Sequence, residues 1–179
     1  GASHLYTREF FALVRAHLAP RGVFLQWIGA AFVDEALLRS LLATLNDVFP
    51  YVRVYRPSPR PQILFLASDA PLALETDAPA ALAATPQAFD SYGYACAEDT
   101  LAALSLDESA SRTFAAGAPV STDDRNLLQM RSPRILGAPL GADGADAVLA
   151  GSDPLPRLAR GFDRLYLVRR LLADGDDAR

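Results

Sequence analysis

Residues 22–28 read GVFLQWI, and this stretch decides the predicted fold. It is a short apolar run rich in β-forming residues, with a Pro-Arg-Gly sequence before it and Gly29 after it. Such a run is typical of a strand buried on both faces, and strands of that kind belong to parallel sheets covered by helices. Open α/β sheets bind ligands at the carboxyl ends of their strands. Gln26 and Trp27 lie near that end, so we expect any functional site close to them.

Hydrophobic periodicity predicts the elements around this strand. Apolar residues recur at helical spacing over residues 3–19 and again over residues 32–49. Residues 51–56 (YVRVYR) and 62–67 (QILFLA) have strand patterns, and a short proline-rich link joins them. The helix between the first two strands predicts a right-handed crossover, whereas the short link predicts that the last two strands form an antiparallel pair.

The second half of the chain is alanine-rich and has shorter patterns. It predicts helices over residues 78–92, 98–104 and 107–116. Residues 126–131 (NLLQMR) are interpreted as a strand or extended segment, and residues 137–146 as a linker. An amphipathic helix is expected over residues 155–171, docked on its own or a neighbouring domain. Binding to a membrane surface or to RNA is the alternative, which interleaved aspartates disfavour.

Composition excludes several classes of protein. Of 179 residues 51% are hydrophobic and the net charge is −4, which argues against disorder and against a general nucleic-acid surface. The single cysteine, Cys96, excludes an intramolecular disulfide and argues against a cysteine-based zinc site. No apolar run approaches the roughly 20 residues of a membrane helix. We therefore expect a soluble, cytoplasmic segment without nucleic-acid or membrane contact.

Three stretches together carry a family resemblance. Residues 3–27 (SHLYTREFFALVRAHLAPRGVFLQW) resemble the helix and strand that follow the catalytic loop of spermidine synthases, the polyamine aminopropyltransferases. Residues 62–69 (QILFLASD) resemble the last core strand of that family. Residues 114–134 (FAAGAPVSTDDRNLLQMRSPR) resemble the closing segment of bacterial spermidine-synthase-like proteins that are fused to membrane or tetratricopeptide segments.

The resemblance implies an α/β fold: a Rossmann-like, methyltransferase-fold sheet of seven strands. This chain would hold strands five to seven, the last pair antiparallel, with a helical segment and a C-terminal helix. Residues 1–69 would be the C-terminal part of the domain, residues 70–136 its helical segment and closing strand, and residues 137–179 a linker and helix. The bare edge of residues 22–28 would pair with the missing N-terminal half or with a second copy.

The resemblance also implies what the chain lacks. The family holds decarboxylated S-adenosylmethionine, or S-adenosylmethionine in methyltransferase relatives, through a glycine-rich turn and an acidic residue in the first four strands. Its catalytic aspartate lies just before the segment that resembles residues 3–27. We therefore expect a fragment that binds no cofactor alone, has no catalytic residue or metal site, and is inactive by itself.

Five residues are candidates for substrate binding. The family places glutamine near the end of this strand to contact the amine, but that position here is Trp27, and Gln26 lies one residue earlier, on the other face. A buried amide is the alternative for Gln26, and packing is the alternative for Trp27. Ser58 stands where polyamine enzymes usually have a tyrosine. Asp123 and Asp124 could hold a cation at the rim, or simply form a turn or cap.

Two classes of function follow. In the first, the parent protein transfers an aminopropyl or methyl group from an S-adenosyl sulfonium to an unknown acceptor, a small-molecule amine or another compound. In the second, the spermidine-synthase-like fold has lost catalysis and serves as a binding or scaffolding module. Ser58 and the displaced Gln26 argue against spermidine synthesis itself.

Overall fold

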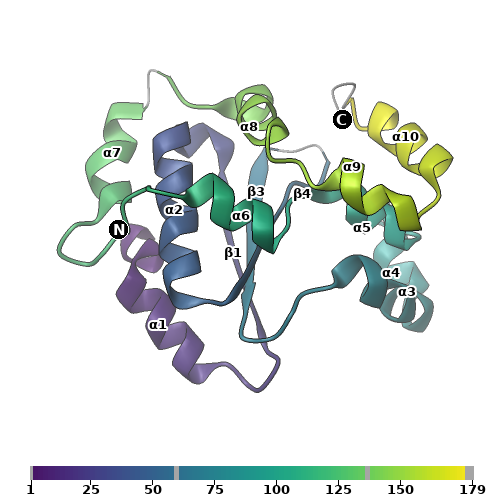
Figure 1. Cartoon of the computed structure of the whole chain (residues 1–179), viewed down its shortest axis with the longest axis horizontal. Coiled ribbons are helices and arrows are strands. Elements are labelled where there is room, and N and C mark those ends of the chain that lie inside the picture. Colours follow the sequence, from purple (N-terminus) through teal and green to yellow (C-terminus); the bar gives the residue numbers. More distant parts are fainter. Residues whose placement is uncertain (1, 59–60, 136–137, 176–179) are drawn as a thin grey trace.

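The computed structural model describes residues 2–58, 61–135 and 138–175, which form a mixed α/β fold (Figure 1). The strands of its four-stranded sheet are β1 (Val23–Gly29), β2 (Tyr51–Tyr55), β3 (Gln62–Ser68) and β4 (Leu104–Leu106). The helices are α1 (Arg8–His17), α2 (Glu35–Val48), α3 (Leu74–Ala84), α4 (Pro86–Asp90), α5 (Ala97–Ala103), α6 (Glu108–Ala115), α7 (Leu127–Ile135), α8 (Gly141–Ala150), α9 (Leu155–Leu158) and α10 (Arg164–Ala173). Short 3-10 helices are η1 (Ala2–Tyr6), η2 (Ala30–Phe32) and η3 (Ala159–Gly161).

The strand order is β1-β3-β2-β4, and every neighbouring pair is antiparallel. The predicted antiparallel pairing of the last two predicted strands is confirmed, because the proline-rich link turns the chain back so that β3 pairs with β2. The expectation that the first strand lies in a parallel sheet is wrong. β1 and β2 run in the same direction, but the reversed strand β3 lies between them. β1 is at the end of the sheet.

One face of the sheet, which carries Val52, Val54, Ile63 and Phe65, is called the first face. The main hydrophobic core lies between this face and helices α1, α2 and α6 (Figure 1). The leucines of α2 are almost inaccessible, at 0–1% exposure: Leu37, Leu38, Leu41, Leu42 and Leu45. Burial of each leucine side chain contributes about 1.5–3 kcal/mol. Asp34 fixes the start of α2, because its carboxylate accepts a hydrogen bond from the backbone N–H of Leu37 at 2.7 Å. The predicted helix over residues 32–49 is thereby confirmed, three residues shorter at its start and one at its end.

The second face of the sheet is covered unevenly. Helix α5 lies there in a smaller cluster with Tyr55 of β2 and Leu66 of β3, and α10 packs against α5 in the same cluster. Beside them, β1 is left open: Val23, Leu25 and Trp27 are 46%, 53% and 55% exposed. The prediction that this strand is buried on both faces is therefore wrong. Side chains alternate between the two faces of a strand, so these three point away from α1. The helices that cover the second face lie over the neighbouring strands and leave β1 uncovered.

The predicted helices over residues 98–104 and 107–116 are confirmed with shifted ends as α5 and α6, and residues 78–92 divide between α3 and α4. Two other predicted segments are wrong. Residues 126–131 start helix α7 instead of forming a strand, because the Asn126 side chain accepts a hydrogen bond from the N–H of Gln129 at 3.0 Å and caps the helix. The expected linker 137–146 contains the start of α8, in which Ala145 and Leu149 are buried; residues 136–137 lie outside the described part. β4 was not predicted.

The single helix expected over residues 155–171 is divided into α9, η3 and α10. Asp163 starts the last helix, because its carboxylate accepts hydrogen bonds from the N–H groups of Leu165 and Tyr166. Within the described residues, no helix combines the length and the apolar character that crossing a membrane requires.

Candidate functional site

Gln26 and Trp27 point to opposite faces of β1, as the one-residue step predicts. Trp27 stands on the open second face beside Leu25. Gln26 is half-buried on the first face, where its side chain is hydrogen-bonded to Tyr6. The Tyr6 hydroxyl also donates to the backbone oxygen of Trp27 at 2.6 Å. Burial raises the pKa of Tyr6, against the opposing effect of Gln26. The side chain of Tyr6 therefore links η1 to β1, the strand that carries the candidate residues Gln26 and Trp27.

Asp123 is joined to the same corner of the molecule. Its carboxylate accepts a hydrogen bond from the hydroxyl of buried Thr7 at 2.7 Å, and its backbone N–H donates to Glu9 at 2.9 Å. Thr7 is also the N-cap of α1. Since Tyr6 and Thr7 are consecutive, the η1–α1 junction brings Asp123 to the side of the sheet on which Gln26 lies. The Asp123 carboxylate is therefore hydrogen-bonded within the fold. This contact is in line with the structural alternative, in which Asp123 belongs to a turn or cap and holds no cation.

The rest of the acidic segment forms a turn. The backbone N–H of Thr122 donates to the oxygen of Arg125 at 3.2 Å, and the N–H of Arg125 donates to the Thr122 hydroxyl at 3.1 Å. Asp124 is exposed at the tip of this turn. Across the described ranges, no group of three or more His, Cys, Asp or Glu side chains is placed to hold a metal ion.

Ser58 is exposed in the link between β2 and β3. The backbone oxygen of Pro61, in the same link, accepts a hydrogen bond from the N–H of Ala30 at 2.9 Å. The link therefore lies at the carboxyl end of β1, the end at which Trp27 stands. The five predicted residues thus divide into two groups: Gln26 and Asp123 beside η1, and Trp27 and Ser58 near the second face, with Asp124 on the exposed turn.

An apolar hollow among the described residues was not predicted. It is an open groove of about 610 Å³ on the second face of the sheet. Leu25, Leu64 and Leu66 from β1 and β3 line it, together with side chains from α3, α4 and the residues that follow. Its aromatic residues are Tyr55, Phe89, Tyr92 and Tyr94. In the sequence, the only signals were the alternating apolar residues of β1 and the aromatic residues after position 88.

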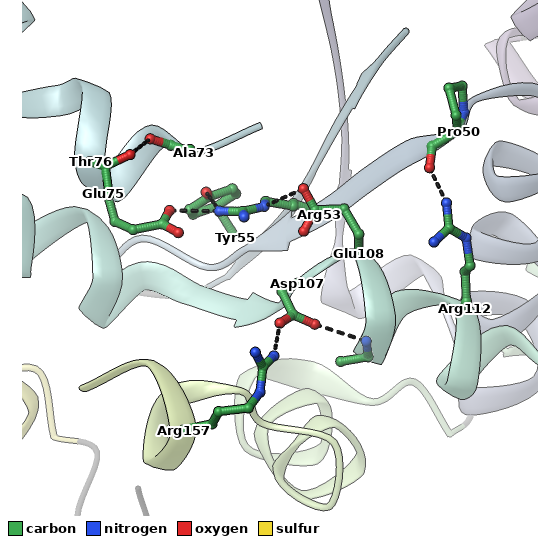
Figure 2. A network of polar contacts seen from close by, with 11 residues as sticks. Pro50, Arg53, Tyr55, Ala73, Glu75, Thr76, Asp107, Glu108, Arg112 and Arg157 are labelled. Carbon is green, nitrogen blue, oxygen red and sulfur yellow. Dashed lines mark hydrogen bonds and ion pairs between the residues drawn. The ribbon is translucent and has the colours of Figure 1, made fainter. Parts of the chain in front are cut away.

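A buried ionic cluster lies next to Tyr55, one of the residues that line the groove; Figure 2 shows the cluster. Arg53 of β2 donates to Glu75 of α3 at 2.6 Å, and its Nε lies 2.9 Å from a carboxylate oxygen of Glu108 in α6. Burial opposes the charge of Arg53, but the bonds to both carboxylates outweigh it and raise the pKa of Arg53. Burial likewise raises the pKa of neighbouring Tyr55 to about 12. The cluster anchors two helices to β2, and all its carboxylates have a cationic partner.

Cys96 is the other potentially reactive group. It is partly exposed before α5, and burial is the main cause that raises the pKa of its thiol. The thiol is therefore protonated at neutral pH and a poor nucleophile.

No protein-family model, curated protein or solved structure gives a significant match to this chain.

Proposed function

We propose that this chain is the C-terminal part of a spermidine-synthase-like transferase domain that uses an S-adenosyl sulfonium cofactor. The observation that carries the proposal is the order of its first elements: β1, α2, β2 and the reversed β3. These are the elements that the sequence resemblance assigns to the last part of such a domain. In this proposal, the free edge of β1 pairs with the rest of the domain or with a second copy.

The chain contributes binding surface in this proposal, and no catalytic group. In the family reaction, a nucleophile of the acceptor attacks the carbon beside the sulfonium, the carbon–sulfur bond breaks to leave a thioether, and the acceptor loses a proton. We assign the uptake of that proton to no described residue; the Asp123 carboxylate accepts a hydrogen bond from Thr7. In this proposal, Trp27 and Gln26 contribute binding surface on the two opposite faces of β1.

The described residues do not fit the cofactor. A nucleoside needs free backbone N–H groups and a carboxylate for its ribose at the ends of the strands. After β1 the N–H of Ala30 is already bonded to Pro61, and β2 runs into the proline-rich link. We therefore assign no cofactor-binding residue to this chain and expect no transfer activity from it alone.

Isothermal titration calorimetry tests the proposal. S-Adenosylmethionine and its decarboxylated form are titrated into this chain and into a polypeptide that also contains the residues encoded immediately before Gly1. We expect no heat of binding with the chain alone and saturable binding with the longer polypeptide. Tight binding by the chain alone, or preceding residues without a glycine-rich turn and an acidic loop, would contradict the proposal.

A non-catalytic binding or scaffolding module is the second candidate. It is favoured by the internal use of the two best polar candidates: Gln26 is bonded to Tyr6, and the Asp123 carboxylate to Thr7. A longer polypeptide that folds cooperatively and binds neither sulfonium compound would select this alternative.

A further inference from the structure

We propose that the groove on the second face of the sheet binds a neutral, mostly apolar small molecule of about the size of a two- or three-ring aromatic compound. If the chain belongs to a transferase, as proposed above, this molecule is the acceptor, and it is not a polyamine. The binding itself does not depend on that assignment, because every residue that lines the groove belongs to this chain.

The size and lining of the groove support a small molecule. Its volume of about 610 Å³ lies within the range of roughly 300–1,000 Å³ that is common for ligand sites. Leucines of the sheet form one wall, and Leu82 and Phe89 of α3 and α4 stand in the other. Aromatic and aliphatic side chains on two facing walls offer good contact to a flat apolar molecule.

The charge of the groove selects against a polyamine. None of the residues that line it is charged; its polar groups are the hydroxyls of Tyr55, Tyr92, Tyr94 and Thr100. A cationic amine buried there would lose its hydration without gaining a carboxylate partner, which is unfavourable. The nearby carboxylates of Glu75 and Glu108 are already paired with Arg53.

Two of the residues that line the groove are exposed to water and would be covered by a bound ligand. Leu25 on β1 is 53% exposed, and Tyr92, beyond α4, is 77% exposed. Both line the groove. Trp27 stands beside Leu25 on the same face and is the only tryptophan of the chain. A molecule seated between the walls would shield Leu25 and Tyr92 from water and would lie close enough to Trp27 to change its fluorescence.

Titration with N-phenyl-1-naphthylamine, a neutral aromatic probe, tests the inference with the full chain and no cofactor. We expect saturable binding of one probe molecule, with quenching of Trp27 emission by energy transfer and no displacement by spermidine. Displacement by spermidine, or the absence of saturable binding, would overturn the inference. Failure here would leave the cofactor titration unaffected, so that the two proposals fail separately.

Two variants locate the probe. Leu25→Glu places a charge in the groove and should weaken binding about tenfold or more. Val168→Glu, on α10, is the matched control, because Val168 is also 53% exposed and does not line the groove; this variant should bind as the parent does. Ala81→Phe fills the groove from α3 without adding charge and should also weaken binding.

Circular dichroism and the thermal midpoint verify that each variant is folded. Equal affinities of the Leu25→Glu and Val168→Glu variants, or unchanged binding by folded Ala81→Phe, would show that the probe binds elsewhere and would refute the inference. Sedimentation at rising protein concentration adds a further test. Dimer formation that expels the probe would also refute it, because a second copy would then be the occupant of the groove.

Discussion

Replacement of Arg53 by alanine should destabilise the fold far more than the loss of a surface ion pair. The side chains of Arg53 and Glu75 are only 9% and 8% exposed, and they lie 2.6 Å apart. Removal of one partner of a buried pair leaves an unpaired buried charge and costs about 3–5 kcal/mol. Since domains of this size are stable by about 5–15 kcal/mol, the loss is a large share of the total.

Arg8→Ala is the matched control for this prediction. Arg8 and Asp47 also form a close pair, at 2.5 Å, but their side chains are 56% and 40% exposed. Water can hydrate the released carboxylate, so this variant should lose at most about 1 kcal/mol. The comparison separates the effect of burial from the effect of removing an arginine.

Urea unfolding at pH 7, followed by circular dichroism and Trp27 fluorescence, measures both losses as shifts of the midpoint at constant slope. The triple variant Arg53→Met, Glu75→Leu and Glu108→Gln removes the charges of Arg53 and of both its carboxylate partners and should recover most of the lost stability. An Arg53→Ala variant as stable as Arg8→Ala would refute the reasoning. So would a triple variant no more stable than Arg53→Ala.

Two further predictions concern Thr7 and Tyr55. Thr7→Ala removes the N-cap of α1 and the hydrogen bond to Asp123, so the free energy of unfolding should fall by about 1–2 kcal/mol in the same urea assay, and Thr7→Ser should retain most of it. The folded-state pKa of Tyr55 is raised to about 12 by burial. Neutral Tyr55 therefore stabilises the folded state fully below the unfolded pKa of about 10. This stabilisation is lost as the pH rises toward 12, and the free energy of unfolding should fall by up to about 3 kcal/mol. Urea midpoints between pH 9 and 11.5 should fall less steeply in Tyr55→Phe; equal slopes would contradict this origin.

The central elements were predictable because their signals are local. The leucine periodicity of α2, with Asp34 at its start, needs no distant partner to be recognised. The strand patterns of β2 and β3 and the short link between them were sufficient to predict the antiparallel pairing. The position of β3 between β1 and β2 could not be predicted from these patterns, because it depends on how the strands compete for neighbours.

The errors arose where a short apolar run fits two structures. Residues 126–131 have the composition of a strand, but a run of this length does not distinguish a strand from the first turns of a helix. The hydrogen bond from the N–H of Gln129 to the Asn126 side chain caps the segment and stabilises the helix. The glycine- and alanine-rich start of α8 resembled a linker, and only the packing of Ala145 and Leu149 against the rest of the fold makes it helical.

The candidate site was only partly predictable for the same reason. Alternation along β1 correctly separated Gln26 from Trp27. The groove, in contrast, joins Leu25 to Phe89, which is more than sixty residues away, and nothing in either local pattern indicates the other. Arg53, the first of two arginines in the strand pattern YVRVYR, was a visible signal of a buried ionic partner. Its partners Glu75 and Glu108 were not identifiable without the tertiary fold.

The division of β1 into two faces limits what any ligand can contact. On the first face, Tyr6 interacts with the half-buried side chain of Gln26 and donates to the backbone oxygen of Trp27. The second face is open, and its apolar side chains continue into the groove through Leu25. A ligand in the groove therefore lies on the face that carries Leu25 and Trp27, opposite to the face that carries Gln26. A molecule in the groove and a molecule at the Gln26 amide would lie on different faces of the sheet, and the exposed apolar side chains of β1 favour the groove.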